Sequence, residues 1–132
     1  MKLSEPVTND NIAVKFMRKV IPRGMVTTQE FFIALILDTQ LRAIGRAILV
    51  AMGTVNTVEV HSRDIFREAI KKNAYGIILA HNHPSGSLKP SSEDVKLACK
   101  LEESGKILGI QVLDNIIITK DKHISKVEGG WE

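Results

Sequence analysis

The sequence predicts an α/β protein in which helices pack on a β-sheet. Residues 30–38 and 76–80 are apolar runs of strand type, and residues 62–73 between them carry apolar side chains at helical spacing. The order strand, helix, strand is typical of a sheet covered by helices. The chain has 132 residues, 44% of them apolar, which is enough for one sizeable core. We therefore expect a single domain over residues 1–132.

Charge and composition favour a cytoplasmic protein. The net charge is +3, and no basic run exceeds two residues, whereas nucleic-acid-binding domains usually cluster their basic side chains. A single cysteine, Cys99, excludes an internal disulfide and suits a reducing compartment. The apolar runs are shorter than the ~20 residues of a membrane span, and the first residues show no signal peptide. Membrane association is not expected, and nucleic-acid binding has only weak support.

A helical lead-in is expected at about residues 9–22, ahead of the first strand. Asn9 or Asp10 can cap the start of this helix, and Pro22 and Gly24 end its pattern. Four apolar side chains at helical spacing form its inward face: Ala13, Phe16, Met17 and Val20.

Two paired strands follow. Residues 30–38 are rich in Phe, Ile and Leu and predict a buried strand. Because the connection is short, residues 42–52 should form its antiparallel partner, in which Gly45 marks a bulge or twist. Residues 53–60 are interpreted as a loop or a short strand.

The second half alternates helix and strand. Ser62 is the expected N-cap of a helix that ends near Asn73, and residues 76–80 form the next buried strand. Residues 91–104 predict another helix, with Gly105 at the left-handed C-cap position.

β-Structure is expected again near the C-terminus. Residues 107–119 predict one bent strand or two short ones, because Asp114 and Asn115 interrupt the apolar pattern. Residues 123–127 predict an edge strand, and residues 129–132 a frayed tail.

The polar loop after the strand at residues 76–80 is the strongest candidate for a site. His81 and His83 stand one residue apart, followed by a tight loop containing Pro84 and Gly86. A loop held at both ends by rigid elements is a common place for functional residues. Neutral imidazole is a good zinc ligand, and a carboxylate such as Asp94 would complete a three-ligand set.

The role of Asp94 has two interpretations. Ser91 and Asp94 have the spacing of a capping box at the start of a helix. Asp94 also shares a helix face with Ala98 and Leu101, which must point to the core, and an inward carboxylate needs a partner. Spacing alone leaves capping and metal binding open.

Glu30 is the candidate general base. Hydrolysis with a metal-activated water needs a group that accepts the proton and later delivers it to the leaving group. Glu30 begins an otherwise apolar strand, where a solvated carboxylate gains little from its neighbours. A surface acid at a strand end is the alternative, because spacing does not bring Glu30 near His81.

Together these residues resemble the JAMM (MPN+) metalloprotease signature. An upstream Glu precedes His-x-His-Pro at residues 81–84 and Ser-x-x-Asp at residues 91–94. The longer match at residues 81–86, with Pro90, is similar to the RadC-like branch, as are residues 31–38 and 108–118. The resemblance runs from about residue 27 to 127, which would be the catalytic core.

The resemblance implies a mixed, curved β-sheet flanked by helices, in the JAMM/MPN-like (cytidine-deaminase-like) three-layer architecture. It implies one Zn²⁺ per chain held by His81, His83 and Asp94. Glu30 would be the general acid/base, and Ser91 would steady the oxyanion. The implied reaction is hydrolysis of a peptide or isopeptide bond in a peptide or protein substrate. The branch carries a traditional DNA-repair label, and its longer members have an N-terminal helix-hairpin-helix region, which we do not expect here. Homo-oligomerisation is left open.

Two departures from the branch stand out. Residues 87–89 read Ser-Leu-Lys where an Asp often follows the Gly, which would alter substrate contacts. Asn115 stands where the branch commonly has His, which matters if that His contributes near the site.

The remaining candidate residues have structural interpretations. His61 and His123 are expected at the surface or in packing, and Cys99 as a structural thiol. Trp131 is expected as a loose packing residue or a partner contact.

Two functions remain side by side. The first is a zinc-dependent hydrolase of the JAMM type. The second is a non-catalytic DNA-associated or protein-docking module that uses the same fold. A zinc nucleobase deaminase is excluded, because that class needs His-x-Glu and a later Pro-Cys-x-x-Cys, and the sequence has neither.

Overall fold

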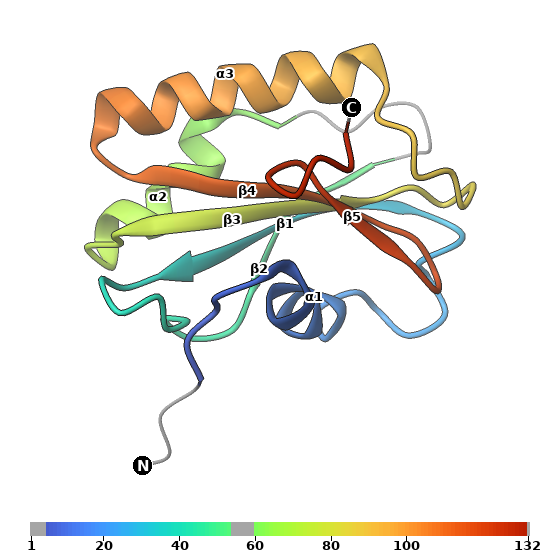
Figure 1. The fold of residues 1–132 in the computed structure, drawn as a ribbon, viewed down its shortest axis with the longest axis horizontal. Coiled ribbons are helices and arrows are strands. Elements are labelled where there is room, and N and C mark those ends of the chain that lie inside the picture. Colours follow the sequence, from blue (N-terminus) through green and yellow to red (C-terminus); the bar gives the residue numbers. More distant parts are fainter. Residues whose placement is uncertain (1–4, 54–59, 132) are drawn as a thin grey trace.

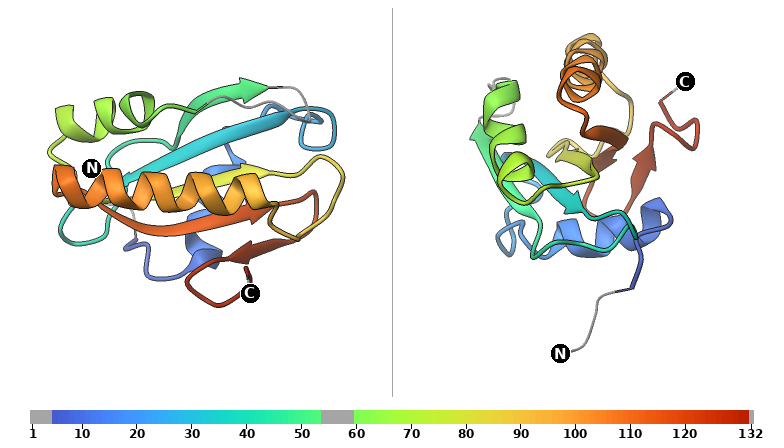
Figure 2. Two further views of the ribbon diagram at one scale, coloured as in Figure 1. Left: turned by 90° about the horizontal axis from the view of Figure 1, so that it is seen from above. Right: turned by 90° about the vertical axis from the view of Figure 1, so that its left-hand side faces the viewer.

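The computed structural model describes residues 5–53 and 60–131 as a three-layer α/β structure (Figure 1). A five-stranded mixed sheet has the order β2-β1-β3-β4-β5. Its strands are β1 (Glu30–Leu37), β2 (Ile48–Gly53), β3 (Gly76–Asn82), β4 (Gln111–Ile118) and β5 (His123–Ser125). Helix α1 (Asp10–Arg18) covers one face, and α2 (Ser62–Lys71) and α3 (Ser92–Leu108) cover the other (Figure 2). The predicted α/β fold with a mixed sheet flanked by helices is confirmed.

One parallel pair determines where a site can form. β1 is antiparallel to β2 and β3, and β5 is antiparallel to β4, whereas β3 and β4 run parallel. A parallel pair needs a crossover connection, which α3 supplies. The carboxyl end of β3 therefore leads to the N-terminus of α3 at one end of the strands.

β1 is buried on both of its faces. Phe31, Ile33 and Leu35 pack into the core on the α1 side, while the alternate residues Phe32 and Ala34 pack into the core beneath α2 and α3. Burial on both faces explains why β1 is a continuous apolar run rather than an alternating one.

The N-terminal predictions hold with shorter boundaries. Asn9 caps α1, because its side-chain oxygen accepts a hydrogen bond from the Ile12 amide at 2.9 Å. The helix ends at Arg18 rather than near residue 22.

The predicted strand at residues 42–52 begins later than expected. Leu41 and Gly45 have positive φ angles of 62° and 79°, so the chain loops before β2 starts at Ile48. Gly45 therefore belongs to this loop, and its interpretation as a bulge within a strand was wrong. Of residues 53–60, Gly53 ends β2, and residues 54–59 lie outside the described part of the chain.

Two helix-boundary predictions were wrong. His61, not Ser62, occupies the N-cap position of α2, and the Ser62 hydroxyl instead hydrogen-bonds the Ser104 hydroxyl of α3 at 2.9 Å. Helix α3 continues past Gly105, and Gly109 with φ of 74° forms its left-handed C-cap.

Gly105 has a packing role inside α3. A Cβ atom built there would lie 2.5 Å from the backbone oxygen of Ile110, which is too close for any side chain. The glycine thus lets α3 approach the start of β4 closely.

The C-terminal segment is ordered by hydrogen bonds. β4 is one strand, with a register shift where Ile77 pairs with Val112 and Ile78 with Asp114. Residues 129–132 were expected to fray. Residue 132 lies outside the described part of the chain, but the Gly129 amide donates to the Lys126 carbonyl at 3.1 Å and the Gly130 amide to the Ser125 carbonyl at 2.9 Å.

None of the helices in the described ranges combines the length and apolar character that crossing a bilayer requires.

Replacing Gly105 with Ala should destabilise the protein by about 1–3 kcal/mol, because the new methyl group must push α3 away from Ile110. Urea unfolding measures this loss. The control is Glu103→Ala at an exposed position of the same helix, which should change the unfolding free energy little. An unchanged midpoint for Gly105→Ala would contradict the close packing.

Candidate metal and catalytic site

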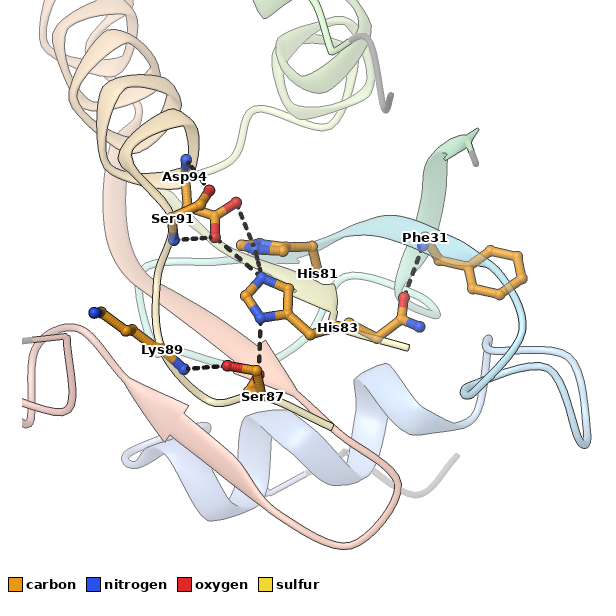
Figure 3. A network of polar contacts seen from close by, with 8 residues as sticks. Phe31, His81, His83, Ser87, Lys89, Ser91 and Asp94 are labelled. Atoms are coloured by element: carbon orange, nitrogen blue, oxygen red, sulfur yellow. Dashed lines mark hydrogen bonds and ion pairs between the residues drawn. The ribbon is translucent and has the colours of Figure 1, made fainter. Parts of the chain in front are cut away.

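Three side chains converge where β3 ends and α3 begins (Figure 3). His81 and His83 come from the end of β3 and the residue after it, and Asp94 comes from the first turn of α3. His81 Nε2 lies 3.1 Å from Asp94 Oδ1, and His83 Nε2 lies 3.0 Å from Asp94 Oδ2. The two Nε2 atoms are 3.2 Å apart. The structure thus brings together the three residues expected to bind metal.

These distances suit a tetrahedral zinc site. Bonds of ~2.0–2.1 Å to zinc separate neighbouring ligand atoms of a tetrahedron by ~3.3 Å. The three observed separations, 3.0–3.2 Å, are close to this edge length, and each histidine faces a different oxygen of the Asp94 carboxylate. Two imidazole nitrogens facing each other at this distance also need a shared cation or proton, so the donor set fits a metal.

The loop after His83 orients its ring. His83 Nδ1 donates to the Ser87 carbonyl at 2.8 Å, which leaves the Nε2 lone pair of a neutral ring turned toward Asp94 and His81. Gly86, with φ of 86°, allows the loop to turn back for this contact. A backbone carbonyl that fixes the second nitrogen is the usual support for a metal-binding histidine.

The capping interpretation of Asp94 is confirmed, and its carboxylate also faces the two histidines. The Asp94 amide donates to the Ser91 hydroxyl oxygen at 3.0 Å, and the Ser91 amide donates to Asp94 Oδ2 at 2.8 Å, which is a complete capping box. The same carboxylate also contacts both histidines, because its two oxygens offer more than one acceptor direction.

Burial and hydrogen bonding act in opposite directions on the charge of Asp94. Burial disfavours the carboxylate, but the hydrogen bonds from His81 and His83 hold the pKa of Asp94 well below its ordinary 3.8. The bond to Asp94 is also the main cause that raises the pKa of His83 above 6.5, while burial opposes the rise. Without metal, the site therefore favours a carboxylate beside an imidazolium.

Glu30 lies close to the histidine pair, at the start of β1. One of its carboxylate oxygens lies within 4.8 Å of ring nitrogens of His81 and His83. Burial raises the pKa of Glu30 above 4.5, and the two histidines partly offset this.

Two carboxylates therefore compete for the role of third ligand. Glu30, His81 and His83 form one possible triad, but Asp94 contacts both histidines at hydrogen-bond distance. Asp94 is the carboxylate at hydrogen-bond distance from both rings, one oxygen to each. Glu30 remains as the half-buried carboxylate beside the set.

A cleft of about 650 Å³ opens over these residues. Its walls include all five candidate residues, together with Phe32, His61, Lys96, Leu97 and Lys100. The Ser91 oxygen accepts the cap bond, and a hydroxyl that accepts can still donate its hydrogen into the cleft.

The sequence analysis missed Asn82 and did not place Trp131 near the site. Asn82 stands between His81 and His83 in the sequence, and its side chain is completely buried. That side chain makes hydrogen bonds to the backbone near Glu30. A polar residue that ends a buried apolar run was the signal for it. Trp131 was expected to be loosely packed, yet its ring meets the His81 ring edge-on, with centroids 6.3 Å apart.

The other candidates lie in different surroundings. His123 pairs with Asp10 at 3.0 Å, as expected of a packing residue. Cys99 is exposed rather than packed, which does not fit its interpretation as a structural thiol. Asn115 is 5% exposed, and within the described residues its side-chain nitrogen has no hydrogen-bond partner.

Comparison with known proteins gives consistent matches. The family described as RadC-like JAB domain matches residues 7–131. A UPF0758 protein of Finegoldia magna is 48% identical over 120 residues, covering 91% of this chain and 52% of that protein. A UPF0758 protein of Clostridium botulinum is 41% identical over 129 residues, covering 98% and 53%. One from Staphylococcus haemolyticus is 38% identical over 131 residues, covering 99% and 54%. The chain spans about half the length of these relatives.

The metal-free protein should lose stability as the pH rises above 6.5. A raised pKa of His83 stabilises the fold fully below the unfolded value of 6.5, and this contribution disappears as the pH passes the higher folded value. The lowered pKa of Asp94 acts oppositely, so its contribution is present above 3.8 and declines as the pH falls.

Urea unfolding in the presence of a chelator, at pH values on both sides of 6.5, measures this dependence. Asp94→Asn should flatten it, because His83 then loses its charged partner. An equally steep decline in Asp94→Asn would contradict the assignment.

Proposed function

This chain belongs to the family of RadC-like JAB domains, and we propose that it is a zinc-dependent hydrolase that cleaves a peptide or isopeptide bond. The observation that carries the proposal is the mutual spacing of His81, His83 and Asp94 at 3.0–3.2 Å, with Glu30 beside them. Two imidazoles and one carboxylate are a ligand set of hydrolytic zinc sites and leave one position open.

His81, His83 and Asp94 would hold one zinc ion. When bound, zinc supplies the Lewis acidity that makes a water molecule nucleophilic near neutral pH. The Ser87 carbonyl and the Ser91 amide orient His83 and Asp94, so these two side chains are held facing each other.

Glu30 would move the proton. Its carboxylate accepts a proton from the attacking water and then delivers it to the leaving nitrogen of the scissile bond. Burial favours this role, because a raised pKa brings the carboxyl group closer to the pH at which it must both accept and release a proton.

Ser91 would stabilise the oxyanion that develops on the scissile carbonyl. Its oxygen accepts from the Asp94 amide at 3.0 Å, and its hydroxyl hydrogen can rotate toward the cleft that Ser91 lines. A donor aimed at developing charge lowers the barrier without reorganising during the reaction.

Metal content tests the ligand set. Wild-type protein purified without added metal should contain about one zinc ion per chain, and Asp94→Ala or His83→Ala should contain little. Asp10→Ala removes the carboxylate of the other His–Asp pair, Asp10–His123, and should keep the metal as a matched control. Metal retained in Asp94→Ala but lost in Glu30→Gln would make Glu30 the ligand instead.

Turnover tests the reaction. Zinc-loaded protein is incubated with a peptide library and with isopeptide-linked protein conjugates, and new termini are detected by mass spectrometry. Glu30→Gln should keep its zinc and lose activity by about 10²–10⁴-fold, the usual contribution of a general acid/base. Full activity in Glu30→Gln would contradict the role of Glu30. Salt-sensitive DNA binding without any hydrolysis would favour the non-catalytic module.

A further inference from the structure

We propose that Asn82 is the positioning residue for Glu30. Its buried side-chain amide ties the backbone on both sides of Glu30 to the strand that carries the two histidines. The catalytic consequence rests on the proposed function, whereas the bridge itself can be tested without it.

The hydrogen bonds of Asn82, which we call the bridge, lie where the pairing of β1 with β3 ends. Main-chain pairing between β1 and β3 extends as far as Phe32 and His81. On its other side β3 continues along β4, because Asn82 pairs with Ile118 and the His83 amide donates to the Ile118 carbonyl at 2.9 Å. Main-chain pairing between β1 and β3 therefore stops at the site, and beyond that point a side chain connects the two strands.

Asn82 makes that connection with three hydrogen bonds. Its Oδ1 accepts from the Phe31 amide at 2.7 Å, a bond drawn in Figure 3. Its Nδ2 donates to the Gln29 carbonyl at 2.8 Å and to the Val26 carbonyl at 2.9 Å. Gln29 and Phe31 are the two neighbours of Glu30, so the backbone of Glu30 is held from both sides.

The chemistry of the three bonds requires a carboxamide. One group must accept from an amide and donate to two carbonyl oxygens, and Asn provides both kinds of atom in one plane. Asp has the same shape, but it would present a carboxylate oxygen to two carbonyl oxygens. Because Asn82 is completely buried, water does not readily replace the two N–H donors that Asp lacks, and the Val26 and Gln29 carbonyls would lose their hydrogen bonds.

The strand pleat explains how the neighbours His81 and Asn82 can contact different parts of the site. Successive side chains of a strand point to opposite faces. His81 can thus turn toward Asp94, while Asn82 turns toward the segment that carries Glu30. The distance between the proposed ligands and Glu30 is therefore set by contacts across β3, and not by the chain that connects β1 to β3.

Hydrogen exchange tests the bridge directly. By NMR, the Phe31 amide of the wild-type protein should be as protected as the Leu35 amide within β1. In Asn82→Asp, and in the uncharged variant Asn82→Ala, only the protection near residues 26–31 should be lost. The control Thr119→Val removes side-chain hydrogen bonds to Lys122 in the turn after β4 and should leave Phe31 protected.

Free exchange of the Phe31 amide in the wild-type protein would overturn the bridge, even if every variant fails to fold. Loss of protection across the whole sheet in Asn82→Ala would make Asn82 a general support of the fold, which contradicts a specific role in placing Glu30.

A double-mutant cycle tests the link to catalysis. On a substrate cleaved by the wild type, Asn82→Asp should lower kcat by about 100-fold, as expected when a reacting group is misplaced. Its KM and zinc content should stay unchanged. In a Glu30→Gln background the same change should have no further effect, because the group that it positions is already gone.

An equal loss of kcat in both backgrounds would show that Asn82 acts independently of Glu30 and would overturn the proposal. If the wild-type protein cleaves nothing, the proposed hydrolase fails. The exchange experiment then still decides whether Asn82 holds the Glu30 segment.

Discussion

The fold and the site both depend on the contacts that the Asp94 carboxylate makes. It accepts a hydrogen bond from the Ser91 amide and lies within 3.1 Å of both histidine rings. One group thus starts α3 and joins it to the end of β3. Since α3 is the crossover between the parallel strands β3 and β4, the same contact fixes where the crossover begins. Hydrogen bonds to a charged group are among the stronger ones in proteins, so this junction is well defined.

Much of the fold and the site could be predicted because the signals are local. The apolar run of β1, the helical pattern of α3 and the Asn9 cap each depend on a few neighbouring residues. His81, His83 and Asp94 stand close together in the sequence, so their spacing carries information. Capping the helix and facing inward looked like alternatives for Asp94, but a carboxylate has two oxygens, so it completes the capping box and contacts both histidines.

What could not be predicted depends on contacts between distant residues. Glu30 reaches the histidines only because β1 pairs with β3 in a register that sets Phe32 opposite His81. Gly105 looks like a helix end, and only the nearby Ile110 carbonyl shows why a glycine lies inside α3. Asn82 has no local signature for its partners, because its three bonds go to a segment more than 50 residues earlier.

The position of Trp131 makes the molecule its own optical probe. The sequence contains one tryptophan, so all indole emission comes from a ring whose centroid lies 6.3 Å from that of His81. Indole fluorescence responds to charge nearby, and a protonated imidazole quenches it. The emission of Trp131 therefore reports on the surroundings of His81 through a single ring contact, without any attached label.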